Sequence, residues 1–153
     1  MNPGPDITVY APDRGVLLVA EVTTEKGTSP EWAAELRSEL LQHMPIVGTA
    51  PYFLIAVPSH FFVWRTDRPH DADALPDYVV DARPFLGRVV DLDRVCLDKV
   101  TRLSLEMIVA TWLQLLTRAR RNGQLPDERQ EWLLESGLLD TIKGGSVRLA
   151  ETA

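Results

Sequence analysis

The stretch ITVYAPDRGVLLVAEV, residues 7–22, decides the fold because it places a strand-like run on either side of a short turn. The runs ITVY (7–10) and GVLLVAEV (15–22) are rich in the β-branched and aliphatic residues that favour strands. The segment between them, APDR (11–14), combines proline with aspartate and is followed by glycine, which are residue types that tight turns prefer. The pattern therefore predicts an antiparallel hairpin.

An amphipathic helix is predicted directly after this hairpin. Ser29 suits the N-cap, and Pro30 suits the first helical position because its missing N–H would find no partner there. Apolar residues then recur at spacings of three and four, which places them on one face of a helix. They are Trp32, Ala33, Leu36, Leu40 and Met44.

Two more strands follow this helix. The runs PYFLIAV (51–57) and HFFVWR (60–65) are joined by a proline and a serine, so they predict a second short hairpin. A strand, a helix and a further strand form a crossover connection, so the runs 15–22 and 51–57 should lie parallel. We therefore expect an α/β fold with a small mixed sheet of about four strands, built from a hairpin, a crossover helix and a hairpin.

The remainder of the chain is predicted to complete one single domain, 1–153. Residues 67–100 begin with polar, proline-interrupted chain and are expected to connect the α/β core (1–66) to a helical C-terminal layer. That layer is expected to occupy 101–153. Its first helix, 101–121, has apolar residues on more than one face, which indicates that it is covered on two sides by this domain or by a second copy.

Composition places the chain among globular proteins. It has 153 residues, of which 45% are hydrophobic, and no uncharged run of the length that a membrane span needs. The N-terminus lacks the features of a signal peptide, so we expect a cytoplasmic location. The single Cys96 is expected to be a small buried thiol. A net charge of −6 disfavours broad binding of nucleic acid, although it does not exclude a local basic groove.

A lone carboxylate, Glu21, ends an apolar run, and a buried acid is costly unless it is paired, hydrogen-bonded or bound to a metal. Folding the hairpin about residues 11–14 brings Asp6 to the same edge of the sheet. Two carboxylates that converge there repel each other unless a cation or a proton lies between them. Oxygen ligands with open positions suit Mg²⁺ or Mn²⁺. The alternative without a metal is that the carboxylates cap backbone amides at the strand ends.

A Pro-Asp pair that opens one strand and an acid that ends the next, here PD-(x)14-E-V-T, resemble the signature of the PD-(D/E)XK nuclease superfamily. The chain is also similar to a widespread group of uncharacterised bacterial proteins with this restriction-endonuclease-like fold. The similarity covers nearly the whole chain. It includes GTSPEWAAELR (27–37), DYVVDARPFL (77–86), EMIVATWLQLL (106–116) and WLLESGLLDTIKGG (132–145).

The resemblance implies that Asp6 and Glu21 are metal-binding acids of the catalytic site. It also implies a lysine two residues after Glu21, where this chain has Thr23. In the family that lysine orients or activates the attacking water and offsets charge at the scissile phosphate. A threonine hydroxyl has no positive charge and cannot do the electrostatic part. Lys26 is near in sequence, but Gly27 marks a turn after it, so we do not expect Lys26 to take over this role.

Three functions follow from these observations. The one we favour is a degenerate nuclease-like domain that is catalytically impaired and acts in binding or assembly, with residual affinity for Mg²⁺, Mn²⁺ or nucleic acid. The second is an active Mg²⁺-dependent deoxyribonuclease, in which Asp6 and Glu21 hold the metal and Lys26 or a lysine of a partner assists. The third is a structural subunit that never binds metal.

A protein partner or a second copy is expected at one of two places. The family core usually begins with a helix and a strand, and here only MNPG precedes Pro5. The strand edge at 7–10 should therefore need cover, because an open edge is a template for pairing. The helix 101–121 is the other expected contact.

Two polar segments have both a functional and a structural interpretation. RPHDAD (68–73) offers His70, Asp71 and Asp73 to a metal-dependent phosphohydrolase site, but the prolines around it exclude a helical frame, so we favour a solvated loop. TRARRNG (117–123) could contact phosphates. Basic residues also suit the last turn of a helix, and we favour that explanation.

Overall fold

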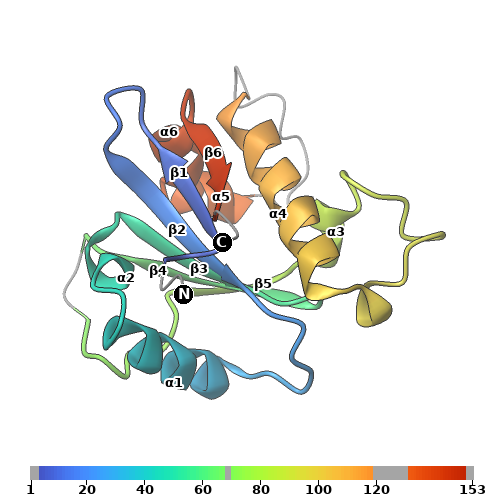
Figure 1. Cartoon of the computed structure of the whole chain (residues 1–153), viewed down its shortest axis with the longest axis horizontal. Helices are drawn as coiled ribbons and strands as arrows, with labels where there is room; N and C mark the ends of the chain where they lie inside the picture. The colour runs from blue at the N-terminus through green and yellow to red at the C-terminus, as the bar shows by residue number, and fades with distance from the viewer. Residues whose placement is uncertain (1–3, 68–69, 119–130, 151–153) are drawn as a thin grey trace.

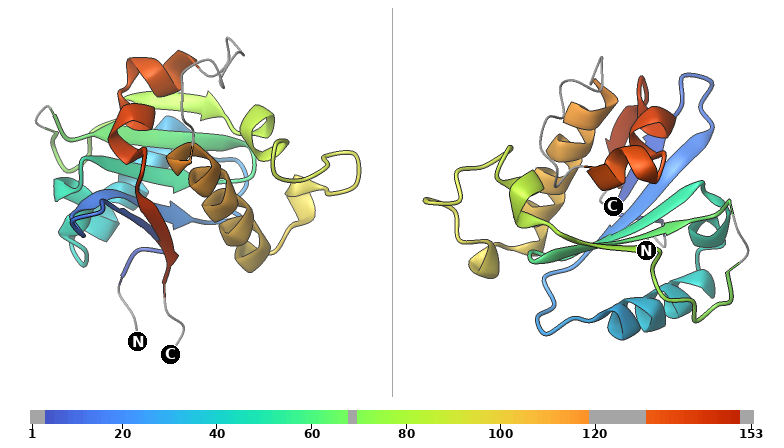
Figure 2. Two further views of the ribbon diagram at one scale, coloured as in Figure 1. Left: turned by 90° about the horizontal axis from the view of Figure 1, so that it is seen from above. Right: turned by 180° about the vertical axis from the view of Figure 1, so that it is seen from behind.

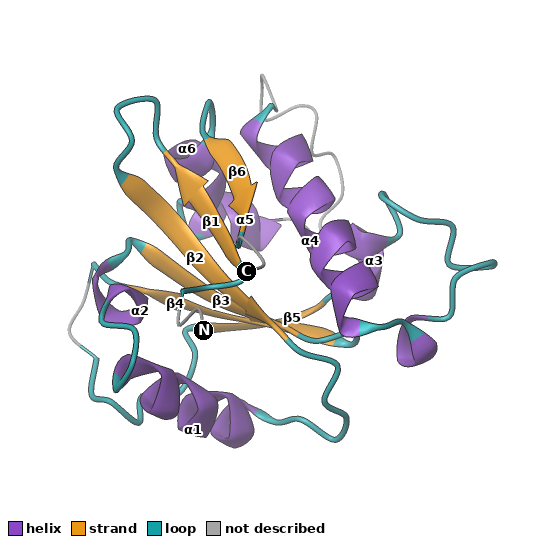
Figure 3. Cartoon of the chain, viewed as in Figure 1, coloured by secondary structure: helices purple, strands orange, loops and turns teal. Residues whose placement is uncertain are grey.

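The computed structural model describes residues 4–67, 70–118 and 131–150, which form a mixed sheet with helices on both faces (Figures 1 and 3). The strands lie in the order β5-β4-β3-β2-β1-β6. In chain order the elements are β1 (Ile7–Tyr10), β2 (Val16–Val22), α1 (Pro30–Leu41), α2 (Ile46–Thr49), β3 (Tyr52–Ala56), β4 (His60–Arg65), β5 (Tyr78–Asp81), α3 (Arg83–Leu86), a 3₁₀ turn (Leu97–Lys99), α4 (Arg102–Thr117), α5 (Glu131–Glu135), α6 (Leu138–Ile142) and β6 (Ser146–Leu149).

The predicted hairpin, crossover helix and second hairpin are confirmed. β1 pairs antiparallel with β2, β2 pairs parallel with β3, and β3 pairs antiparallel with β4. The crossover helix α1 begins where the sequence predicts it. Pro30 is its first residue, and the Ser29 side chain accepts a hydrogen bond from the Trp32 N–H at 3.1 Å. This cap satisfies one of the amides that a helix start leaves without a partner.

The sheet is larger than the four strands expected from the sequence. Residues 67–100, which were expected only to connect two parts, contain β5, and β5 pairs antiparallel with β4. Residues 101–153 are not wholly helical either, because they return to the sheet as β6, which pairs antiparallel with β1. The strand edge at 7–10 is therefore covered by this chain itself, and the expectation that it lies open is wrong. β6 is the edge strand instead.

Each face of the sheet has its own hydrophobic core. α1 and α2 cover one face, where Phe53 and Trp64 pack with ring centroids 5.4 Å apart. α3, α4, α5 and α6 cover the other face, as the view from above also shows (Figure 2). There Phe61 stacks on Trp112 with centroids 4.7 Å apart, and Phe85 contacts both rings. These two layers hold the strand ends, and with them the polar side chains discussed below, in fixed positions.

Helix α4 is apolar on its buried side and partly apolar on its exposed side. Leu105, Val109 and Leu113 are fully buried, whereas Met107 and Leu103 are 55% and 61% exposed. The predicted helix 101–121 begins at Arg102, and its last three residues lie outside the described residues, as does most of the basic segment TRARRNG.

Cys96 is exposed, so the expectation of a buried thiol is wrong; it precedes a short 3₁₀ turn on the surface rather than a core element. No helix among the described residues has both the length and the apolar character needed to cross a membrane.

Candidate functional site

The register of the first hairpin brings Asp6 and Glu21 together at one edge of the sheet. Ile7 pairs with Ala20 across β1 and β2, so Asp6 stands opposite Glu21 one step further along the ladder. Residues that stand opposite each other on antiparallel strands direct their side chains to the same face. The two carboxyl groups lie close enough to share a hydrogen bond. The start of β1 and the end of β2 thus carry a pair of acids in contact.

Asp6 is nearly buried, with 8% of its surface exposed, and both of its carboxylate oxygens are engaged. Its Oδ2 accepts a hydrogen bond from the Val22 N–H at 2.8 Å. That amide lies past the last paired residues of β1 and β2, so the Asp6 carboxylate caps a donor that the ladder no longer satisfies. Its Oδ1 forms an ion pair with Arg102. Amide capping, the arrangement expected in the absence of a metal, is therefore present at Asp6.

Arg102 is the cation at this site, and the sequence patterns did not single it out. It is the first residue of α4, where Thr101 is the N-cap and accepts the Ser104 N–H at 3.1 Å. Its guanidinium joins two acids, because Nη2 contacts Asp6 and Nη1 lies 3.3 Å from Glu106 Oε2. One signal was present in the sequence: a positive charge is disfavoured in the first turn of a helix, so an arginine there indicates an acidic partner nearby.

The proton balance of the acid pair follows from its burial. The pKa of Glu21 is raised from its ordinary value of 4.5 to about 8, first because burial penalises the charged form and second because the Asp6 charge lies beside it. The Arg102 charge opposes this shift. Burial and the Asp6 charge also raise the pKa of Glu106. At neutral pH Glu21 therefore keeps its proton, and the pair of acids has both a proton and a guanidinium to offset the repulsion.

Thr23, which stands where the family resemblance implies a lysine, and Lys26, which was not expected to replace it, contribute no cation to the acid pair. Thr23 stands in the loop after β2, and its Oγ1 accepts a hydrogen bond from the Glu25 N–H at 3.3 Å. Lys26 is exposed, and it is not among the described residues that line the groove in front of Glu21. The positive charge at the site comes from Arg102, which lies at the start of α4, far along the chain from Thr23 and Lys26.

A groove of about 430 Å³ opens in front of the acid pair, between the end of β2 and α1. Four of its nine described lining residues are acidic, and its apolar part consists of Val22, Trp32 and Leu36. The ionisable lining residues are Glu21, Glu25, Glu35, Glu39 and Arg102. Because Glu21 holds its proton at neutral pH, the lining has three charged acids and one cation, and this net negative charge repels phosphate groups. The groove therefore does not favour a nucleic-acid strand.

A divalent metal ion does not fit these residues as they lie. Both Asp6 oxygens are engaged, one by the Val22 N–H and the other by the Arg102 guanidinium. Within the part of the chain that the structure describes, no three histidine, cysteine, aspartate or glutamate side chains are placed to hold one metal ion. A metal would first have to displace the guanidinium of Arg102.

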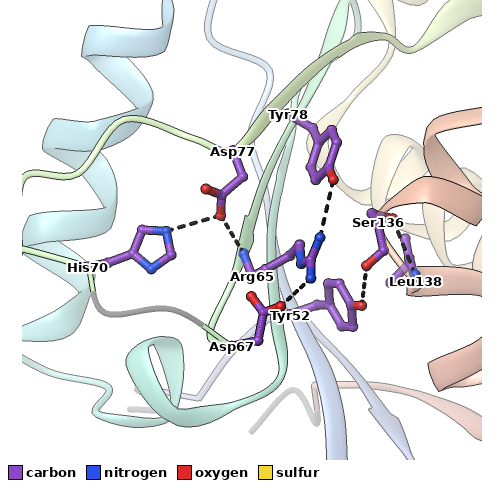
Figure 4. Close-up of polar contacts among 8 residues, drawn as sticks. All are labelled: Tyr52, Arg65, Asp67, His70, Asp77, Tyr78, Ser136 and Leu138. Carbon is purple, nitrogen blue, oxygen red and sulfur yellow. Dashed lines mark hydrogen bonds and ion pairs between the residues drawn. The ribbon is translucent and has the colours of Figure 1, made fainter.

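A second polar cluster attaches the loop before β5 to the sheet (Figure 4). Asp77 Oδ2 accepts the Arg65 N–H at 2.7 Å and lies 3.0 Å from His70 Nε2. The His70 side chain is 8% exposed, so the expectation of a solvated loop is wrong at this residue. The Arg65 guanidinium contacts Asp67 and lies 3.4 Å from the Tyr78 hydroxyl. The cluster connects β4, β5 and the loop that joins them.

Comparison of the chain with protein-family models, with curated proteins and with solved structures found no match.

Proposed function

We propose that this chain is a cytoplasmic, degenerate PD-(D/E)XK nuclease-like domain that acts in binding or assembly and does not hydrolyse phosphodiester bonds. The order of a hairpin, a crossover helix and a hairpin, with an acid pair at the hairpin edge, supports the nuclease-like ancestry. The observation that carries the loss of activity is the Asp6–Arg102 ion pair. It puts a guanidinium of the chain itself where a nuclease of this kind needs a metal ion.

The chemistry of hydrolysis explains why a guanidinium cannot replace the metal ion. A bound metal polarises the phosphoryl oxygen and generates a hydroxide nucleophile by lowering the pKa of its water. A guanidinium offsets negative charge but has no open coordination position for water. Thr23 adds no charge, and the acidic groove in front of Glu21 repels the phosphate backbone. Each part of the hydrolytic apparatus is therefore missing or occupied.

The retained charges have a structural use instead. Arg102 connects the start of α4 to the start of β1 through Asp6, and Asp6 in turn fixes the Val22 amide at the end of β2. Because α4 covers one face of the sheet, this contact fixes the position of the helix relative to the hairpin. We therefore expect the function to lie in binding of other molecules at the surface of the sheet and its helices.

A plasmid-nicking assay tests the proposal. Supercoiled plasmid is incubated with the purified protein and Mg²⁺ or Mn²⁺, beside Asp6→Asn and, as a matched control, Asp140→Ala. Asp140 is a surface carboxylate whose side chain is 70% exposed. We expect the same low level of nicked plasmid from all three proteins as from buffer.

The rival function is an active Mg²⁺-dependent deoxyribonuclease. It would be supported, and our proposal contradicted, by metal-dependent nicking that Asp6→Asn abolishes and Asp140→Ala retains. Nicking that survives the Asp6 substitution would indicate a contaminating nuclease, and the proposal would stand.

A further inference from the structure

Strand β6 is the last strand of the sheet and lies beside α4, and its hydrogen bonds show which of its backbone groups face away from β1. The Ala150 N–H donates to the Asp6 carbonyl at 2.8 Å, so Ala150 directs its backbone groups toward β1. Backbone groups alternate in direction along a strand, so Arg148 also faces β1, whereas Val147 and Leu149 face away from it. Since β6 is the last strand of the sheet, these two residues present N–H and C=O groups to whatever lies beside β6.

A groove of about 890 Å³ runs along this edge, between β6 and α4. On its α4 side lie the apolar Met107 and Ala110 and the polar Thr111 and Gln114. Leu149 faces the same side because it pairs with Ile7, which points into that core. Met107 is 55% and Leu149 43% exposed, which is unusual for side chains of this size. An unpaired strand edge beside exposed apolar side chains is the form of site that accepts an added strand.

The opposite side of the same edge is basic. Arg148 pairs with Thr8 across β1 and β6, so it lies on the face away from the α4 core. A smaller hollow at the end of the groove is lined by Arg148 together with Arg14 and Tyr10. Among the described residues neither guanidinium has an ion-pair partner. The nearby carboxylate of Asp13 is turned to the Gly15 N–H at 2.9 Å.

The charge of this edge contrasts with that of the whole chain. The chain has 22 acidic residues and a net charge of −6. None of the described residues that line the groove or the adjoining hollow is acidic. A site whose described lining holds two arginines and no acidic residue favours an acidic ligand.

We propose that β6 binds an extended segment of a partner protein in which apolar and acidic residues alternate. The added strand bonds to the outward N–H and C=O groups of Val147 and Leu149. Because side chains of a strand alternate between faces, its apolar residues contact Met107 and Leu149, and its acidic residues face Arg148 and Arg14. This site is separate from the acid pair at Asp6, so it does not depend on the nuclease ancestry.

Two other occupants fit less well. Two copies of β6 joined across a two-fold axis would bring both Arg148 side chains close together, and like charges on neighbouring strands destabilise pairing. A nucleic-acid strand would find the two arginines but would leave the exposed apolar side chain of Met107 and the backbone groups of β6 without partners. Both occupants are included in the test.

The test uses two short synthetic peptides that differ only in charge. One alternates valine with glutamate and the other alternates valine with lysine. Binding is followed by chemical-shift changes and hydrogen exchange of backbone amides in the full chain. We expect micromolar binding of the glutamate peptide, with new protection of the Val147 and Leu149 amides, and binding of the lysine peptide weaker by about tenfold or more.

Three variants locate the site. Leu149→Pro removes an outward N–H that the β1 ladder does not use, so it should abolish binding, while Leu149→Ala keeps the amide and should weaken binding only slightly. Arg148→Glu should reverse the preference between the two peptides. Unfolding in urea checks that each variant is folded, and the reversed preference of Arg148→Glu would not result from a loss of structure.

Several results would overturn the proposal. These are equal affinity for the two peptides, absence of binding by the glutamate peptide, or binding that leaves the Val147 and Leu149 amides unprotected. Sedimentation that reveals a dimer disrupted by Leu149→Pro would assign the edge to a second copy. Tighter binding of a single-stranded oligonucleotide than of the glutamate peptide, lost in Arg148→Glu, would assign it to nucleic acid.

Discussion

Arg102 and Asp6 form an ion pair although 96 residues separate them in the sequence. Asp6 is nearly buried at the start of β1, and Arg102 reaches it from the first turn of α4. A lone buried carboxylate needs a proton, a metal ion or a cationic side chain beside it. In this fold the chain supplies the cationic side chain itself, and this relationship underlies the first predictions below.

Removing the guanidinium should destabilise the protein. Arg102→Ala leaves the buried acids Asp6 and Glu106 without their common partner, and an unpaired buried acid is costly. We expect a loss of about 1–3 kcal/mol in the free energy of unfolding, measured in urea. The matched control is Arg94→Ala, because Arg94 has an 87% exposed side chain and only a surface contact with Asp91. It should change the same quantity by less than about 0.5 kcal/mol, and equal losses for both variants would contradict the account.

Stability should depend on pH through Glu21. Below pH 4.5 this carboxyl is protonated in both the folded and the unfolded chain, so it contributes no pH dependence. Between 4.5 and about 8 the unfolded chain has released the proton and the folded chain still holds it, so stability falls as the pH rises. Above about 8 the loss is complete. Because the side chain is partly exposed, we expect a total on the order of 1–2 kcal/mol.

The variant Glu21→Gln isolates this effect. Glutamine resembles the protonated acid and does not titrate, so the difference in unfolding free energy between the variant and the wild type removes the contributions of all other groups. We expect the stability of the variant relative to the wild type to increase as the pH is raised from 5 to 9, because this interval includes the folded-state pKa of about 8. A difference that stays constant over this interval would show that Glu21 is not held in its protonated form.

The hydroxyl of Tyr52 should matter for the attachment of the C-terminal helices. It donates to the Ser136 carbonyl at 2.5 Å, at the turn between α5 and α6, and this bond is buried (Figure 4). Tyr52→Phe keeps the ring and leaves that carbonyl without its donor, so we expect a loss of about 1–2 kcal/mol in unfolding free energy. Tyr10→Phe, at a partly exposed position at the end of β1, serves as the control and should have a smaller effect. Equal effects would contradict the assigned bond.

The loop before β5 should be held less firmly to β4 when Asp77 is neutralised. Asp77 accepts hydrogen bonds from the Arg65 amide and lies against His70, so Asp77→Asn weakens two contacts at once. We expect faster hydrogen exchange at the Arg65 amide, with little change in the amides of β2. Asp73→Asn, at an exposed position of the same loop, should leave the Arg65 amide unchanged. The prediction fails if the two variants give the same exchange rates.

The local part of the fold was predictable from the sequence because its determinants are close together in the chain. The turn at 11–14, the cap at Ser29 and the alternating apolar runs each act over a few residues, and together they specify the hairpin and the parallel crossover. The approach of Asp6 to Glu21 follows from the hairpin alone. These features require no knowledge of how the helices pack.

The long-range part was not predictable in this way. β6 has only four residues with one partly buried side chain, Val147, and its partner β1 lies at the other end of the chain. The place of Arg102 in the first turn of a helix is unusual for a cation, but its acidic partner is identified only when α4 is placed beside β1. His70 lies between prolines in a polar segment, and only the folded chain brings Asp77 to its ring. In each case the decisive contact joins segments whose pairing no local pattern specifies.

The measurement that tests the central claim most directly is a calorimetric titration with Mn²⁺ of the wild type, Arg102→Ala and the double variant Asp6→Asn with Arg102→Ala. If the guanidinium of Arg102 stands in for a metal ion, the wild type should take up no Mn²⁺ at millimolar concentration. Arg102→Ala should bind it, and the double variant should lose that binding. Binding of Mn²⁺ by the wild type that the double variant loses would contradict the claim and restore the acid pair as a metal site.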